Sequence, residues 1–329
     1  MTHSMRRTAT VVVCVGIATA ALGVSGQQPA TRQPATRADA EQWMTTASNW
    51  GKWGKDDQLG SLNYITNAKR QQAAALVKTG EVISMERPIV LQERHEEIKR
   101  DGKPNGISFY EMTFRTFPKG DPRGNDGFTS DVQSFAPHGS LLTHLDALCH
   151  DSDGKGHLYN GYVLSDTVTE AKGCEKLGLD TLKQGVVTRG ILVDMTRLSA
   201  PHTPGAPAYK EDLEAWEKKV NLKVSPGDAL FVYNPRPAQA RGARGTPGLT
   251  GGIDLSVVNW MKERGVALTS GADHRLTLVA AGIFLLDFPD LVQVSETAAR
   301  LGRWEFMLTI APVPVTGGTG FPLNAIAMF

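Results

Sequence analysis

The stretch HGSLLTHLDALCH at residues 138–150 contains an unusual concentration of metal-binding side chains. Four of the eight histidines of the chain fall within twenty residues: His138, His144, His150 and His157. A carboxylate, Asp146, stands among them. Imidazole nitrogens and carboxylate oxygens bind zinc, manganese or iron(II), and hydrolytic metal sites usually keep one coordination position open for water. The stretch therefore indicates a metal site, although the same residue types also occur in solvated loops.

The spacing within this stretch can bring three side chains together. Residues two apart in an extended segment share a face, so His144 and Asp146 can point the same way. Residues four apart share a face of a helix, so a helix that begins near Asp146 would turn His150 toward the same point. We therefore expect a strand that turns into a helix at Asp146.

Residues 1–26 are predicted to be a signal peptide. Arg6 and Arg7 form a positive n-region, an apolar run follows at residues 8–24, and small residues close the segment. The run is short for a membrane span, which needs about 20 residues, so we expect no stable membrane insertion after cleavage. An uncleaved anchor is the alternative. Residues 27–39, rich in Pro, Gln, Thr and Ala, are predicted to be a disordered tether. The mature protein should be periplasmic or secreted.

Residues 40–329 are predicted to form a single domain, because no linker divides them. The chain is 41% hydrophobic and 21% charged with a net charge of +1, which lacks the basic excess of a nucleic-acid-binding protein. Cys149 and Cys174 are the cysteines that remain after signal removal. No disulfide framework is implied, and a single bond between these two stays open.

Helices and strands are predicted to alternate along this domain, so the fold class is α/β or α+β. Apolar and β-branched runs predict strands at 81–90, 185–195, 228–234, 266–269, 283–286 and 304–313. Helices are predicted at 67–79, 210–219 and 255–265. The polar residues 91–135 are predicted to be a long irregular insertion that serves as a lid or binding loop.

Further candidate residues lie outside the histidine-rich stretch. His274 follows the strand predicted at 266–269, and Asp287 closes the strand predicted at 283–286. Strand ends of this kind commonly carry the chemistry of α/β folds. Trp50 and Trp53 stand in a glycine-bearing loop, where they could stack on a flat substrate or fasten an N-terminal arm to the core.

Four blocks of the sequence resemble the cyclase family, which includes bacterial kynurenine formamidases and isatin hydrolases. Residues 143–150, THLDALCH, resemble the family's T-H-x-D-x-x-x-H core, and residues 50–66, 154–162 and 303–320 resemble blocks of its larger members in the same order. The resemblance implies a swivelling β/β/α domain that assembles as a homo-oligomer and acts on a small-molecule substrate.

The resemblance also implies roles for particular residues. His144 and Asp146 match metal ligands, and His150 matches the acid/base histidine of the family. His274 and Asp287 lie where the family has a later histidine and an acidic residue that complete the site.

One part of the motif departs from the family. The family usually has H-x-G-T-H where this chain has Ser140 and Leu142. His138 is the nearest replacement for the missing histidine, and it could reach a metal if the backbone bulges. A regular strand would keep it too far away.

The function implied is that of an exported divalent-metal hydrolase, with zinc or manganese as cofactor. A metal-bound hydroxide would attack the carbonyl of an amide, lactam or ester of an aromatic or cyclic substrate, with His150 moving the proton. A metal-dependent cyclase or lyase and a non-catalytic secreted binding protein are the alternatives. A serine hydrolase is disfavoured, because residues 27–329 contain no G-x-S-x-G sequence.

Overall fold

The computed structural model describes residues 35–87, 109–117, 119–120, 122, 128–139, 142–198, 206–235 and 252–329. The predicted signal peptide and most of the predicted tether lie outside these residues. Residues 37–39 of the predicted tether belong to helix α1 (Arg37–Thr46), which begins with a capping box between Thr36 and Asp39. No helix of the described residues is both long enough and apolar enough to cross a membrane.

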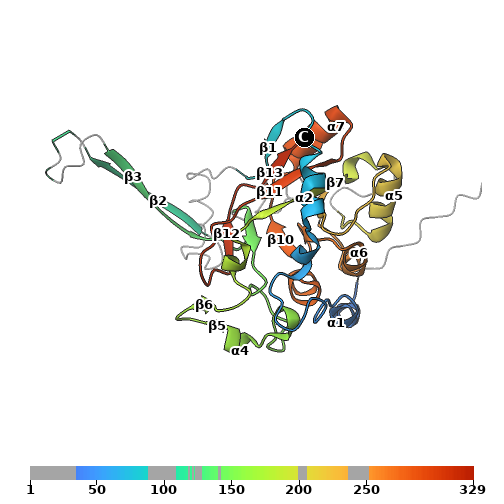
Figure 1. The fold of residues 1–329 in the computed structure, drawn as a ribbon, viewed down its shortest axis with the longest axis horizontal. Coiled ribbons are helices and arrows are strands. Elements are labelled where there is room, and N and C mark those ends of the chain that lie inside the picture. The colour runs from blue at the N-terminus through green and yellow to red at the C-terminus, as the bar shows by residue number, and fades with distance from the viewer. Residues whose placement is uncertain are drawn as a thin grey trace, which may run out of the picture. The chain divides into compact units, whose positions relative to one another are not determined.

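A nine-stranded sheet forms the centre of the fold (Figure 1). Its strands are β1 (Val82–Ser84), β4 (His144–Asp146), β7 (Val186–Asp194), β8 (Ala229–Tyr233), β9 (Leu268–Thr269), β10 (Phe284–Asp287), β11 (Glu305–Ile310), β12 (Gly320–Pro322) and β13 (Ile326–Met328). They lie in the order β1-β13-β11-β7-β8-β9-β10-β4-β12. Strands β7 to β10 pair in parallel, and the outer pairings are antiparallel.

Strand β7 separates two hydrophobic cores. Ile191 and Val193 pack into one core together with Trp216, and Leu192 packs into the other together with Phe306. Successive strand residues point to opposite faces, so a strand covered on both sides reads as a nearly continuous apolar run. This is why the sequence predicts β7 well.

Helices surround the sheet: α2 (Asn67–Ala74), α4 (Leu164–Thr167), α5 (Lys210–Val220), α6 (Val257–Arg264), α7 (Val292–Leu301) and the π-helix η6 (Arg275–Ala281). Short 3₁₀ turns lie at η1 (Gly60–Tyr64), η2 (Tyr159–Gly161), η3 (Leu179–Leu182) and η4 (Met195–Arg197). Helix α6 ends at Gly265, whose positive φ of 68° is the usual left-handed cap. The sheet contains both parallel and antiparallel pairs, and helices accompany it. The fold is therefore of the predicted α+β class.

The prediction of an irregular insertion at residues 91–135 was wrong for its described part. Strands β2 (Phe109–Phe117) and β3 (Phe128–Ala136) pair antiparallel over nine residues each as a separate two-stranded ribbon (Figure 1). Most of the described side chains of the ribbon are exposed on both faces, so the ribbon buries no continuous apolar face. In β2, Tyr110, Met112 and Phe114 alternate with polar residues, which is a strand pattern that the prediction did not use. Near the start of β2 and the end of β3, Tyr110, Met112 and Phe135 pack with the buried Leu142.

Candidate metal centre

Strand β4 carries two of the predicted ligands on one face. It lies between β10 and β12, with His144 opposite Asp287 and Asp146 opposite Leu285. His144 and Asp146 are 1% and 0% exposed, and 3.3 Å separates His144 Nε2 from Asp146 Oδ1. The intervening Leu145 packs into the hydrophobic core. A strand of three residues therefore aims an imidazole and a carboxylate at one point, as their spacing indicates.

The ends of β9 and β10 bring two more predicted residues to the same point. His274 caps the π-helix η6 that follows β9, and Asp287 is the last residue of β10. His274 Nε2 lies 3.2 Å from Asp146 Oδ2 and 3.2 Å from Asp287 Oδ2. Because β9 and β10 are parallel neighbours, the segments that leave their carboxyl ends meet at one edge of the sheet.

His138 reaches the cluster from the segment after β3. The backbone turns at Gly139, which has a φ of 99°. The ring then donates from Nδ1 to Asp146 Oδ1 over 3.0 Å, while Nε2 lies 2.9 Å from the hydroxyl of Thr319. Ser140, where the family has its histidine, lies outside the described residues. His138 therefore contacts the same carboxylate oxygen that faces His144.

His150 approaches from a turn, so the prediction of a helix that begins at Asp146 was wrong. Strand β4 ends at Asp146, and a tight turn follows in which the His150 amide donates to the Ala147 carbonyl over 2.9 Å. The adjacent Cys149 forms a disulfide with Cys174. The His150 ring stacks on His138 with 3.6 Å between centroids and 5° between planes.

These side chains form two groups that could each hold a divalent cation. One group is His138, His144 and Asp146, and the other is Asp146, His150 and His274; within each, the ligand atoms lie within 4.8 Å of one another. Asp146 belongs to both groups. Asp287 adds a second carboxylate through its contact with His274.

The hydrogen bonds of the centre fit a bound cation. His144 Nδ1 donates to the Leu142 carbonyl over 2.9 Å, so Nε2 is the ring nitrogen that faces Asp146, and it is an acceptor when it carries no proton. Two acceptors 3.3 Å apart repel each other unless a cation or a proton lies between them. Asp146 Oδ2 is also buried and accepts no hydrogen bond among the described residues, although His274 Nε2 lies 3.2 Å away. Buried acceptors without a hydrogen bond are costly, and a bound cation or a protonated side chain beside them would reduce that cost.

The electrostatics of the cluster assign different protonation states to its members. Burial acts to raise the pKa of Asp146, but contacts with three imidazoles outweigh burial and hold this pKa well below its usual range. Contacts with the two carboxylates raise the pKa of His274 to about 10. Burial lowers the pKa of His150 to about 4. Without a metal at neutral pH, His274 is therefore protonated and occupies the place of a cation, while His150 is neutral.

The two tryptophans and His157 have partners outside the candidate metal centre. Trp50 donates from its indole nitrogen to the Val279 carbonyl over 2.6 Å and meets His157 edge to face. Trp53 packs edge to face against Tyr64. His157 pairs with Asp153 and is 45% exposed. Trp50 therefore fastens the N-terminal loop to η6, as one of the two roles predicted for it requires. Stacking of Trp50 and Trp53 on a substrate stays a prediction.

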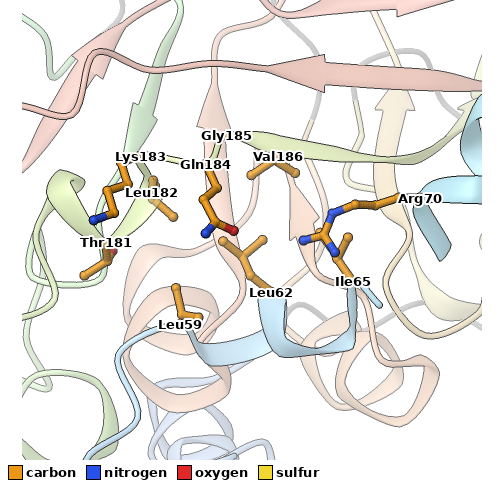
Figure 2. A pocket seen from close by; sticks show the side chains of 10 residues that line it. All are labelled: Leu59, Leu62, Ile65, Arg70, Thr181, Leu182, Lys183, Gln184, Gly185 and Val186. Atoms are coloured by element: carbon orange, nitrogen blue, oxygen red, sulfur yellow. The ribbon is translucent and has the colours of Figure 1, made fainter. Parts of the chain in front are cut away.

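A pocket of about 180 Å³ is lined by residues from η1, α2 and the segment that leads into β7 (Figure 2). It includes Gly185 and Val186 at the start of β7, whereas Asp287 stands at the end of β10. Apolar residues such as Leu62 and Ile65 line it together with two cations, Arg70 and Lys183. The pocket is therefore separate from the candidate metal centre.

Three residues of the site escaped the sequence reasoning. Thr319 contacts His138, and Gly320 leaves room for the His138 ring, since a Cβ atom at Gly320 would lie 2.5 Å from His138 Cε1. Phe288, which follows Asp287, has a φ of 55°, and its carbonyl accepts a hydrogen bond from Thr143. Positive φ is rare for a bulky residue and is concentrated near functional sites. The glycine-rich sequence at 317–320 predicts a turn, but nothing in the sequence indicates that this turn contacts His138.

Comparisons with known proteins show the family to which the chain belongs. The family model described as "Putative cyclase" matches residues 66–274. A crystal structure described as a novel cyclase is 29% identical, with a TM-score of 0.71 over 86% of this chain and 99% of the other. Isatin hydrolase A from Ralstonia solanacearum is 16% identical, with a TM-score of 0.49 over 75% of this chain and 91% of the other. None of the curated proteins compared with the chain matches it. The family model spans more than half of the chain and includes His138, His144, Asp146, His150 and His274, so this protein belongs to the cyclase family.

Proposed function

We propose that this protein is a divalent-metal-dependent hydrolase that cleaves the C–N or C–O bond of an amide, lactam or ester. The observation that carries the proposal is the 3.3 Å approach of His144 Nε2 to Asp146 Oδ1 in a buried site, with two further imidazoles on the same carboxylate. Membership of the cyclase family supports it.

His144 and Asp146 would hold the cation, together with His138 or His274. Imidazole and carboxylate ligands suit zinc or manganese, and these are the metals we propose. A divalent cation in such a site polarises a substrate carbonyl and makes a coordinated water acidic near neutral pH. The Leu142 carbonyl fixes the ring orientation of His144, which is the role of outer partners in metal sites generally.

His150 would carry the proton. Its ring is neutral at pH 7, because burial lowers its pKa to about 4, and it has no hydrogen-bond partner among the described residues. Its nitrogen atoms are therefore available to take a proton from the attacking water and return it to the leaving group. Stacking on His138 fixes the plane of the ring.

Elemental analysis combined with a hydrolysis screen tests the proposal. We expect the purified mature protein to contain zinc or manganese and to hydrolyse a member of a panel of aromatic amides, lactams and esters. Chelation should abolish this activity, and the metal should restore it. His144→Ala should lose the metal, whereas His157→Ala, a histidine outside the cluster, should keep it. Full hydrolysis by metal-free protein would contradict the proposal.

Isotope labelling separates hydrolysis from the metal-dependent cyclase or lyase alternative. In ¹⁸O-labelled water, a hydrolase places labelled oxygen in its acid product, whereas ring closure or elimination places none there. A protein that binds metal but converts no substrate would favour the binding role instead.

We propose further that the protein is exported and forms a homo-oligomer. The basic and apolar residues at 6–24 support export, as does the Cys149–Cys174 disulfide, since disulfides persist mainly in oxidising compartments. Fractionation of cells that produce the full chain should place a shortened protein in the periplasm or medium; a full-length cytoplasmic product would contradict this. Sedimentation of the mature protein tests the oligomer.

A further inference from the structure

We infer that the Cys149–Cys174 disulfide positions the two stacked imidazoles of the centre, and that breaking it lowers turnover without emptying the metal site. The inference rests on the proposed function for its catalytic consequence. Its structural basis is independent of that function and lies in three chain segments that meet at the disulfide.

The first segment is the turn that presents His150. Cys149 directly precedes His150, and the turn is closed by the bond from the His150 amide to the Ala147 carbonyl. The Ala147 amide donates to the Thr319 carbonyl over 2.9 Å. The His150 side chain forms no hydrogen bond among the described residues, so its position depends on this turn and on stacking.

The second segment is β6 (Gly173–Cys174), which pairs with β5 (Val168–Thr169). The Cys174 amide donates to the Gly317 carbonyl over 3.0 Å. The two backbones approach so closely that a Cβ atom on Gly173 would lie 2.2 Å from the Gly317 oxygen. The side of the disulfide away from His150 is therefore held against the glycine-rich loop at residues 317–320.

The third segment is that loop, which supports His138. Thr319 contacts His138 Nε2 over 2.9 Å, and the absence of a side chain at Gly320 gives the His138 ring its space. The Leu179 amide fixes the loop from behind by donating to the Gly318 carbonyl over 3.0 Å. The disulfide thus ties the support of His138 to the turn of His150.

The consequence is that one covalent bond sets the relative positions of two rings from different segments. The sulfur atoms are well shielded, because Cys149 is 4% and Cys174 is 2% exposed. Their loss should release the turn and the loop locally while the sheet that carries His144 and Asp146 remains. A displacement of about 1 Å at a reacting group can cost a hundredfold in rate, so turnover should fall while the metal stays bound.

The test compares the double variant Cys149→Ser/Cys174→Ser with the wild-type protein by hydrogen–deuterium exchange, metal titration and steady-state kinetics. We expect amide exchange to accelerate by about tenfold or more in peptides that cover 147–150 and 317–320, and to stay unchanged in β7 and β8. We expect kcat to fall by about ten- to a hundredfold, with zinc or manganese affinity altered much less. Lys172→Ala, at an exposed residue beside β6, is the matched control and should change none of these readouts.

The results separate the possible failures. Unchanged exchange in both peptides, or unchanged kcat in the double variant, would overturn the inference. Accelerated exchange in a protein that never hydrolyses any substrate would contradict the proposed function and leave the mechanical role of the disulfide intact. If the double variant does not fold, wild-type protein treated with a phosphine reductant under native conditions gives the same comparison. Full turnover after both thiols are titrated would then overturn the inference.

Discussion

The imidazole of His150 lies face to face with that of His138, with 3.6 Å between the ring centroids. Two imidazolium rings at this distance would repel each other, so the stack favours a neutral ring at one of the two positions. Burial selects His150 as the neutral ring, because it lowers the pKa of His150 to about 4. The stack therefore pairs a ring that hydrogen-bonds to Asp146 with a neutral ring that forms no hydrogen bond to the part of the chain that the structure describes.

Replacing His150 by alanine should separate metal binding from catalysis. We expect kcat to fall by about a hundred- to ten-thousandfold, which is the usual contribution of a general acid–base residue. Metal content should stay near that of the wild type, because His138, His144 and Asp146 form a complete group without His150. Elemental analysis and kinetics on the same preparation check both parts. Loss of the metal in this variant would show that His150 is a ligand instead.

Replacing Asp146 by asparagine should remove the metal. The substitution preserves the shape of the side chain but deletes the charge that two cation-binding groups share. Changes to outer partners of metal sites cost about ten- to a hundredfold in affinity, so loss of a shared ligand should cost more than about a hundredfold. Titration with zinc or manganese measures the change. Asp151→Asn, at a half-buried carboxylate that belongs to neither cation-binding group, serves as the control, and equal affinities for the two variants would contradict the assignment.

Adding a methyl group at Gly320 should displace His138. The new Cβ atom would lie 2.5 Å from His138 Cε1, and overpacking of this kind costs about 1–3 kcal/mol in unfolding free energy. We expect Gly320→Ala to lower both thermal stability and metal affinity. In the double variant His138→Ala/Gly320→Ala the clash is absent, so the two effects on stability should not add. Full additivity would mean that the ring does not occupy this space.

Metal affinity should rise with pH because of His274. Contacts with Asp146 and Asp287 raise its pKa to about 10, above the value near 6.5 expected in the unfolded chain. His274 therefore stabilises the metal-free fold below pH 6.5, and this contribution is lost as the pH rises through about 10. Metal coordination by its Nε2 must displace the proton, so between these values affinity should increase by up to about tenfold per pH unit.

Calorimetry can count this proton. Titrations of the metal in buffers with different ionisation enthalpies should show proton release at pH 7.5 in the wild-type protein and less release in His274→Gln. Equal proton release from the two proteins would exclude His274 as the source.

The sequence by itself determined the parts of this protein that depend on local spacing. The apolar residues Val186, Val187 and Ile191 to Val193, within 185–195, predict β7, because a strand covered on both faces is rich in apolar residues. The two-residue spacing of His144 and Asp146 places both on one face of β4. The same two residues belong to the motif on which the family resemblance rests, and the family model confirms that family.

Only the tertiary structure decided how the centre is completed. His138 meets Thr319 across 181 residues of sequence, and His274 and Asp287 reach Asp146 because β9, β10 and β4 are neighbours in the sheet. The turn at Ala147–His150, the disulfide to Cys174 and the pairing of β2 with β3 were likewise not predicted from the sequence. Strand order and loop contacts arise from packing between segments that are distant in the sequence. Local periodicity reports which residues face a core, so it does not reveal contacts at a site that such segments build together.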